Sequence, residues 1–375
     1  MKSFDLGKMY EATRLTRAGR LNDALAVLQA ATVGEKTARG STPEIIEAQI
    51  VSDEEVPTRF STVVPHLFHA LDGVTLPGAK HRTPQITDIV PEGGHYISGE
   101  FSNSGGRRSY KLYVPTIRDA GPRPLIVMLH GCTQTADDFA AGTRMNFAAE
   151  AHGCFVVYPE QPQAANASKC WNWFRPGDQT RGSGEPSLIA GITRQVIEAH
   201  DIDPARVYVA GLSAGGAAAA IMGEAYPDLY AAVGVHSGLA CGAAHDMASA
   251  FAAMRGGGKT SKGRAAVSPK PTIVFHGDRD ATVHPCNGAD VIARVADDAN
   301  LETQTVHKRS PQGHSFSHTV HRDAAGSGIL ELWELHGAGH SWSGGSPAGS
   351  FTSANGPDAS KEMLRFFLQH RLSPS

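Results

Sequence analysis

A serine held between two glycines constrains the fold of this chain more than any other feature. The residues Gly211-Leu212-Ser213-Ala214-Gly215 form a G-x-S-x-G motif, which follows the apolar run Val207–Ala210 and opens the alanine-rich segment Ala214–Ala225. This order predicts a buried strand, a sharp turn and a helix. Such a turn lifts a serine hydroxyl clear of a sheet, so Ser213 is a candidate nucleophile.

Strands and helices alternate through residues 100–375. Seven apolar runs predict strands, at Tyr110–Val114, Leu125–Leu129, Phe155–Tyr158, Val207–Ala210, Ala232–Val235, Thr272–Phe275 and Ile329–Leu335. Four segments with a helical period lie among them, at Ser187–Ala199, Ala214–Ala225, Ala289–Asp298 and Ala359–Leu368. The alternation predicts an α/β domain with a mostly parallel central sheet flanked by helices. In such sheets the residues that bind ligands follow the carboxyl ends of the strands.

The first 99 residues have a different pattern. Residues 1–31 predict a short amphipathic helix, because apolar side chains recur from Leu15 to Leu28 at spacings of three and four. Residues 32–99 contain six prolines and no sustained period, which predicts a linker of little regular structure.

Composition excludes several classes of protein. The 34 Lys and Arg nearly balance the 37 Asp and Glu, for a net charge of −3, which gives no reason to expect nucleic-acid binding. No apolar run approaches the roughly 20 residues that span a bilayer. The N-terminus lacks the apolar region of a signal peptide, so we expect a cytoplasmic protein, with secretion as the alternative. The five cysteines are too few for a disulfide scaffold, and their pairing stays open.

A serine nucleophile needs a base, and a base of this kind is oriented by an acid. His340 follows the predicted strand Ile329–Leu335 across a glycine turn, and His336 is its local rival. Asp280 follows the predicted strand Thr272–Phe275, and Asp278 competes with it. The order Ser, Asp, His is that of a nucleophile-elbow enzyme, and both candidates for each role fit it. We favour Asp280 as acid because it lies deeper in its loop, and His340 as base because His336 lies at the last step of the strand, before the glycine turn. Asp278 is at a position where a turn-forming aspartate commonly has a structural role.

The oxyanion of an acyl-transfer reaction needs hydrogen-bond donors. One is expected from the backbone N–H of Ala214, the residue after the nucleophile, and a second from the N–H of Cys132, in the loop after Leu125–Leu129. His130 in the same loop is expected to be a structural ring packed beneath it. This chemistry requires no metal and no cofactor.

Three tryptophans lie in predicted loops on the catalytic side. They are Trp171 and Trp173, in a Cys-Trp-Asn-Trp-Phe cluster, and Trp342, two residues after His340. Each is a candidate substrate-binding residue, and anchoring of its own loop is an equal alternative.

Five stretches together point to a family. They are 124–134, Cys170-Trp171-Asn172-Trp173, 208–216, His276-Gly277-Asp278-Arg279-Asp280 with Val283, and Gly339-His340-Ser341-Trp342. In this order they resemble the poly(3-hydroxybutyrate) depolymerase family of esterases, which is related to feruloyl and acetylxylan esterases. The resemblance covers about residues 98–369. It implies an α/β-hydrolase fold, with Ser213 as nucleophile, Asp280 as acid and His340 as base.

The resemblance implies hydrolysis of short hydroxyacyl or aromatic esters. We expect a serine carboxylesterase that hydrolyses poly(3-hydroxybutyrate) or its oligomers through an acyl-enzyme. The alternatives are a feruloyl or acetylxylan esterase, a peptidase with the same triad, and a non-catalytic granule-binding protein that keeps the fold. The helix of residues 1–31 is a candidate contact with the surface of a polyester granule; packing on its own domain or a dimer contact is an equal alternative.

Overall fold

The computed structural model describes residues 83–116, 121–258, 270–296 and 300–373. The predicted helix of residues 1–31 and most of the predicted linker lie outside the described residues. Helix α4 (Ile86–Ile89) and strand β1 (His95–Asn103) begin before residue 100, so regular structure extends into the last part of the predicted linker. Strand β1 carries no apolar alternation that the sequence could reveal, because it is an edge strand with most of its residues exposed.

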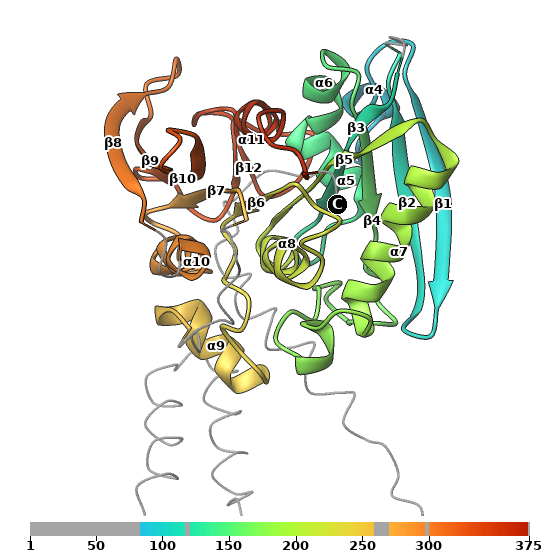
Figure 1. Cartoon of the computed structure of the whole chain (residues 1–375), viewed down its shortest axis with the longest axis horizontal. Coiled ribbons are helices and arrows are strands. Elements are labelled where there is room, and N and C mark those ends of the chain that lie inside the picture. The colour runs from blue at the N-terminus through green and yellow to red at the C-terminus, as the bar shows by residue number, and fades with distance from the viewer. Residues whose placement is uncertain (1–82, 117–120, 259–269, 297–299, 374–375) are drawn as a thin grey trace, which may run out of the picture. The chain divides into compact units, whose positions relative to one another are not determined.

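Ten strands form one sheet in the order β1-β2-β4-β3-β5-β6-β7-β10-β9-β8 (Figure 1). Besides β1, they are β2 (Gly106–Val114), β3 (Arg123–Leu129), β4 (Phe155–Pro159), β5 (Ile202–Leu212), β6 (Ala232–His236), β7 (Thr272–Gly277), β8 (Glu302–Arg309), β9 (Ser315–Arg322) and β10 (Gly328–Leu335). The six central strands from β4 to β10 run parallel. Antiparallel pairs β1–β2 and β9–β8 extend the sheet at its two ends. Two short strands, β11 (Trp342–Ser343) and β12 (Thr352–Ser353), pair separately.

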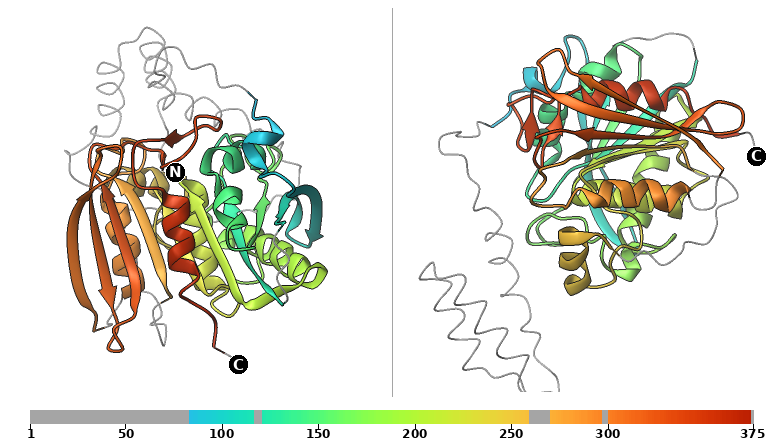
Figure 2. Two further views of the ribbon diagram at one scale, coloured as in Figure 1. Left: turned by 90° about the horizontal axis from the view of Figure 1, so that it is seen from above. Right: turned by 90° about the vertical axis from the view of Figure 1, so that its left-hand side faces the viewer.

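Helices cover both faces of the sheet (Figure 2). Their bounds are α5 (Ala136–Thr143), α6 (Met145–Glu150), α7 (Gly184–Ala199), α8 (Ala214–Ala225), α9 (Met247–Gly256), α10 (Cys286–Ala296) and α11 (Ala359–Phe367), with a 3₁₀ turn η1 (Pro176–Asp178). Helices α7, α8 and α10 share one apolar cluster with the sheet, and α5, α6 and α11 share the other. The prediction of a mostly parallel sheet flanked by helices is confirmed. Every helix in the described ranges is too short or too polar to cross a lipid bilayer.

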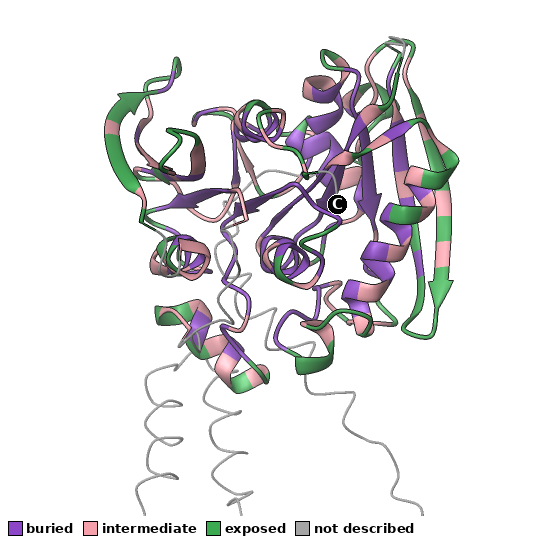
Figure 3. Cartoon of the chain, in the orientation of Figure 1, coloured by how far each residue is buried: buried purple, intermediate pink, exposed green. Residues whose placement is uncertain are grey.

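Burial on both faces explains why the central strands read as continuous apolar runs. In β3, Leu125, Val127 and Leu129 point into one cluster, while Ile126 and Met128 point into the other. Figure 3 shows this buried centre, with exposed residues concentrated on the edge strands β1 and β8. Strands β8 and β9 were not predicted, because their side chains are mostly polar. Nearly all of β8 is exposed, and β9 is largely half-buried.

Candidate active site

Ser213 occupies a sharp turn between β5 and α8. Its backbone adopts φ 58° and ψ −120°, a conformation that L-residues rarely take outside strained functional turns. The flanking glycines make the turn possible: a Cβ on Gly211 would lie 2.2 Å from the Gly215 carbonyl oxygen, and one on Gly215 would lie 2.0 Å from the Leu129 carbonyl oxygen. The strand, turn and helix predicted around Ser213 are therefore all present, and the serine is held at the carboxyl end of a central strand.

The two predicted oxyanion donors, the backbone N–H groups of Cys132 and Ala214, belong to residues that line the same pocket as Ser213. Ala214 is the first residue of α8, where an N–H has no acceptor within the helix and the helix dipole favours negative charge. The N–H of Gly131 already donates to Gln134 Oε1 at 2.9 Å. The N–H of the next residue, Cys132, has no acceptor in the described part of the chain. The loop is thus built so that Cys132, and not Gly131, has a donor to offer.

Asp280 and His340 come together from the loops after β7 and β10. Asp280 Oδ2 and His340 Nδ1 are 2.7 Å apart, with both side chains largely buried. The other carboxylate oxygen, Oδ1, accepts hydrogen bonds from the backbone N–H groups of Thr282 and Val283 at 2.9 and 2.8 Å. Asp280 therefore occupies Nδ1 of His340 and leaves Nε2 for a proton transfer, as a triad requires.

The surroundings of Asp280 keep it ionised. Burial acts to raise its pKa, but the hydrogen bond and charge of His340, the N–H of Val283 and the nearby ring of His276 together outweigh that effect, so the pKa is lowered. His276 Nε2 donates to the Val283 carbonyl oxygen at 2.9 Å and lies 3.5 Å from Asp280 Oδ2. The carboxylate is therefore charged at neutral pH and can stabilise an imidazolium on His340.

Ser213 is connected to the His340 loop through His236. The backbone N–H of Ser213 donates to the His236 carbonyl oxygen at 2.9 Å, and His236 Nε2 accepts from the N–H of Ser343 at 3.0 Å. The Ser213 hydroxyl itself makes no hydrogen bond to His340 within the described residues. Bonds of this kind are often long in an enzyme without substrate and tighten when substrate binds.

His130 is a structural ring, as expected from the sequence. It is buried beneath the loop that carries Cys132; its Nδ1 donates to the Gly131 carbonyl oxygen at 2.7 Å, and its Nε2 accepts from the Gln161 N–H at 3.0 Å. Burial lowers its pKa to about 4, so the ring is neutral at neutral pH. Both ring nitrogens are occupied, which leaves His130 no free group for catalysis.

A disulfide joins Cys132 to Cys170. It ties the loop with the candidate oxyanion donor to the segment that carries the tryptophan cluster. That segment is anchored in turn by Glu185 near the start of α7, whose carboxylate accepts from the backbone N–H and side-chain amide of Asn172 at 2.7 and 2.6 Å. Burial raises the pKa of Glu185, and Arg108 is its nearest cation, at 3.7 Å.

The three tryptophans differ in position. Trp173 is mostly buried and lines a pocket beside Ser213. Trp171 has no exposed surface, and its indole N–H donates to the His130 carbonyl oxygen at 3.1 Å. Trp342 is also fully buried; it stacks on His236 and donates to Ser360 Oγ at 3.1 Å. Trp171 and Trp342 thus act as loop anchors in this structure, and Trp173 remains the candidate for substrate contact.

The pocket beside Ser213 encloses about 410 Å³, counted out to its open mouth. Ser213, Ala214 and Cys132 form one side of it. The rest is apolar and includes Trp173 and Phe174. A group bound there would lie against the nucleophile and the oxyanion donors together.

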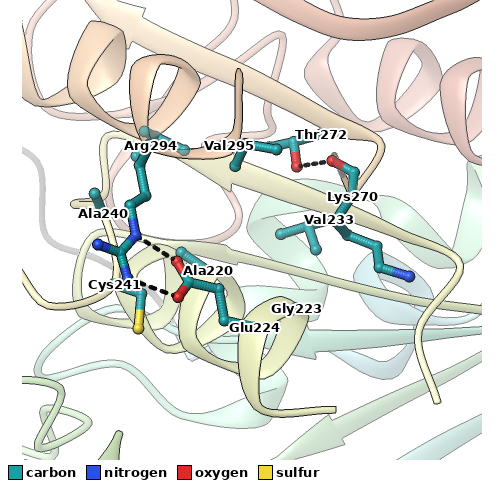
Figure 4. A pocket seen from close by; sticks show the side chains of 11 residues that line it. Ala220, Gly223, Glu224, Val233, Ala240, Cys241, Lys270, Thr272, Arg294 and Val295 are labelled. Carbon is teal, nitrogen blue, oxygen red and sulfur yellow. Dashed lines mark hydrogen bonds and ion pairs between the residues drawn. The ribbon is translucent and has the colours of Figure 1, made fainter. Parts of the chain in front are cut away.

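A second pocket, of about 310 Å³ counted out to its open mouth, lies at the opposite edge of the sheet, where β6 and β7 begin (Figure 4). The Arg294 guanidinium forms a two-bond ion pair with Glu224 across it. Cys241 also lines this pocket, and burial raises the pKa of its thiol to about 12, so the thiol stays protonated. This edge carries the amino ends of the strands, away from Ser213.

Sequence reasoning missed residues that shape the site without taking part in the chemistry. Gln134 ends the stretch 124–134 that carries the family resemblance, and the sequence assigned it no role. Its side-chain amide bridges Gly131 and Asp138 and so shapes the loop that carries Cys132. The sequence does not reveal the anchoring role of Glu185, because a glutamate near the start of a helix is common. The spacing of apolar residues on α9 could have revealed that helix, but the segment is short and alanine-rich.

Comparisons with known proteins show the family and the fold of this chain. The family described as esterase PHB depolymerase matches residues 108–308. The chain belongs to this family. The match covers more than half of the chain and shows the family, while the roles of Ser213, Asp280 and His340 rest on the geometry above.

The similar proteins carry names of different activities. The chain is 36% identical over 270 residues to poly(3-hydroxyalkanoate) depolymerase C of Paucimonas lemoignei, a match over 69% of this chain and 63% of the relative. It is 34% identical over 152 residues to feruloyl esterase B of Thermothelomyces thermophilus, over 40% of this chain and 51% of the relative. The chain therefore matches between about half and two thirds of the length of these relatives.

The fold recurs in a solved structure. The acetyl xylan esterase from Aspergillus awamori superimposes with a TM-score of 0.51 at 21% identity, over 67% of this chain and 95% of that one. At this identity the likeness concerns the fold alone. With the sheet order above, it identifies the α/β-hydrolase fold that the sequence predicts.

Proposed function

We propose that this protein is a serine carboxylesterase that hydrolyses poly(3-hydroxybutyrate) or its oligomers. The observation that carries the proposal is the strained turn at Ser213, which lies beside the two candidate oxyanion donors at the same strand edge as the Asp280–His340 pair. A serine, a histidine oriented by a buried carboxylate, and paired backbone N–H groups are the parts that acyl transfer needs.

The proposed reaction has two halves. Ser213 Oγ attacks the ester carbonyl carbon while His340 Nε2 takes the hydroxyl proton, and the N–H groups of Cys132 and Ala214 bind the oxyanion. The bond between the carbonyl carbon and the alkoxy oxygen breaks, the leaving alcohol takes the proton from His340, and an acyl-enzyme remains. Water activated by His340 then releases the acid and restores Ser213. One oxyanion donor of this kind is worth about 2.7–4 kcal/mol.

The choice of a polyester substrate is supported by the family and by the similarity to a depolymerase over 69% of the chain. Feruloyl or acetylxylan ester hydrolysis is the second candidate, favoured by the feruloyl esterase relative. Attachment to a polyester granule through residues 1–31 stays a prediction, because those residues lie outside the described ones.

The Cys132–Cys170 disulfide bears on where the protein works. Disulfides persist in oxidising compartments and are rare in the cytoplasm. The bond links two loops of the proposed site, so we expect the protein to work where this bond persists. That expectation favours the secreted alternative over the cytoplasmic location expected from the N-terminal sequence.

The test is release of free 3-hydroxybutyrate from amorphous poly(3-hydroxybutyrate) granules, with Ser213→Ala as the matched variant. We expect release by the wild type and a loss on the order of 10⁶-fold in kcat for the variant. A wild-type preparation that cleaves a soluble butyrate ester but not granules would favour the small-ester or cell-wall alternative. Inactivity of folded protein on both would favour a non-catalytic binding role.

A further inference from the structure

One face of α9 forms a wall of the pocket beside Ser213. The wall consists of Met247, Ala250, Phe251 and Met254, which follow one another at spacings of three, one and three and so share one side of the helix. We propose that this pocket receives the acyl group of the ester and that the α9 wall sets the length of acyl group that Ser213 can accept. The inference rests on the proposed function, because it takes Ser213 as the nucleophile.

The residues that line the pocket indicate which side of the ester enters it. Ser213, Ala214 and Cys132 border it, so it opens directly beside the carbonyl carbon and the oxyanion. His340 is not among the described side chains that line it. The leaving alcohol must lie against His340, which protonates it. The group in the pocket is therefore the acyl group, and the alcohol lies on the other side of Ser213.

The chemistry of the lining indicates which acyl groups fit. Apart from the Ser213 hydroxyl and the Trp173 indole, the described side chains that line the pocket are hydrocarbon or sulfur. A sugar ring would bury hydroxyls there without hydrogen-bond partners, at a cost of about 1–3 kcal/mol each. We infer that the pocket takes a mainly hydrocarbon acyl group of a few carbon atoms. A 3-hydroxybutyryl group fits this description, because it brings one oxygen, at C3, where a sugar ring would bring several hydroxyls.

Helix α9 is anchored at both ends. At its start, Asp246 accepts from the N–H of Ser249 at 2.7 Å in a capping box. At its end, the Met254 carbonyl oxygen accepts from the His284 N–H at 2.7 Å, and the Asn287 side chain donates to the Ala253 carbonyl oxygen at 3.0 Å. His284 and Asn287 follow the loop that carries Asp280. The α9 wall is thus attached to the same segment as the acid and holds a defined position beside the nucleophile.

Ala250→Leu tests the wall by filling the pocket. The assay compares kcat/KM for p-nitrophenyl acetate, butyrate and hexanoate, so that the leaving group stays constant. One methylene more or less in an apolar pocket changes kcat/KM by about 10–200-fold. We expect Ala250→Leu to lower kcat/KM for butyrate and hexanoate at least tenfold relative to acetate.

Phe251→Ala tests the wall in the opposite direction. Phe251 is half-buried, so its removal enlarges the pocket without emptying the core. We expect the ratio of hexanoate to acetate kcat/KM to rise about tenfold. The matched control is Ala252→Leu, an exposed alanine on the outer side of α9, which should leave all ratios unchanged. Varying the alcohol of a butyrate ester should affect wild type and Phe251→Ala equally.

The outcomes separate this inference from the proposed function. A wild type that hydrolyses these esters, with Ala250→Leu and Phe251→Ala changing all acyl lengths in parallel, overturns the acyl-pocket assignment alone. A change that follows the alcohol instead of the acid also overturns it. A folded wild type that cleaves no ester overturns the proposed function. Thermal unfolding checks the fold of each variant, and Phe251→Ala decides the matter if Ala250→Leu does not fold.

Discussion

Two aspartate–histidine pairs bridge the same two loops, and they differ in burial. Asp280 and His340 are 2.7 Å apart with side-chain exposures of 0% and 11%. Asp278 and His336 are 3.1 Å apart with side-chain exposures of 44% and 40%. The four residues are the two candidates for the acid and the two for the base, of which the sequence favoured Asp280 and His340. The tertiary structure pairs each aspartate with its own histidine and places only one pair out of water.

The exposed pair even has a serine of its own. His336 Nε2 lies 2.7 Å from Ser317 Oγ, so Ser317, His336 and Asp278 have the hydrogen-bond pattern of a triad. Ser317, however, lies inside strand β9 and is buried, with no helix beginning after it. The comparison teaches that hydrogen-bond geometry alone does not make a catalytic site. A strained turn and free backbone donors at a helix start distinguish Ser213.

The largest effect that tests this comparison is expected from Asp280→Asn. An amide can donate to His340 Nδ1 and hold the ring in the wrong tautomer, and we expect kcat to fall by about 10⁴-fold. The measurement is kcat on p-nitrophenyl butyrate, with circular dichroism to check the fold.

The double variant Asp278→Asn/Asp280→Asn sharpens this test. If Asp278 cannot replace Asp280, the double variant keeps the residual rate of Asp280→Asn. A further large loss in the double variant would show that the exposed aspartate acts as a second acid, and the distinction between the two pairs would fail.

A second prediction concerns acid and the buried histidines. Burial lowers the pKa of His130 to about 4 and of His236 to about 3, from an ordinary value of 6.5. Between pH 6.5 and the lowered pKa of each ring, the histidine of the unfolded chain binds a proton that the same histidine in the folded chain does not. The stability that these rings contribute is therefore complete above about pH 6.5 and is lost as the pH falls toward the folded value. By pH 4.5 each ring should have lowered the free energy of unfolding by on the order of 2 kcal/mol relative to neutral pH.

Denaturant unfolding at pH 7.5 and pH 4.5 measures this loss. His130→Gln removes one titrating group, so it should reduce the difference between the two pH values by about 2 kcal/mol. A difference between the two pH values that stays the same in His130→Gln would contradict the assignment of the acid sensitivity to this buried ring.

The smallest effect is expected from Asp278→Asn. An exposed ion pair contributes about 0–1 kcal/mol, so the variant should unfold within about 1 kcal/mol of wild type. Its kcat should stay within about fivefold of wild type, since 1 kcal/mol corresponds to roughly a factor of five. A loss of kcat close to that of Asp280→Asn would break the comparison. Denaturant unfolding and the same ester assay check both numbers.

The described fold followed from the sequence wherever local pattern and burial coincide. All seven predicted strands are present. Five of them, β3 to β7, are continuous apolar runs because they are buried on both faces, whereas β2 and β10 mix apolar and charged residues. The edge strands β1 and β8 and the half-buried β9 beside β8 were missed, because strands of mostly polar residues carry no such signal. Helix α9 was missed because it is short and alanine-rich, although it forms a wall of the pocket beside Ser213.

The sequence by itself determined the turn at Ser213, because two glycines, a preceding apolar strand and a following helix are all local features. The sequence favoured Asp280 and His340 as partners, and the tertiary structure brings them to 2.7 Å of each other although they are 60 residues apart in the chain. The tertiary structure alone decided that Cys132 pairs with Cys170 and that Trp342 is buried in the core. These outcomes depend on how loops from different strands pack at one edge of the sheet, and no local pattern encodes such distances.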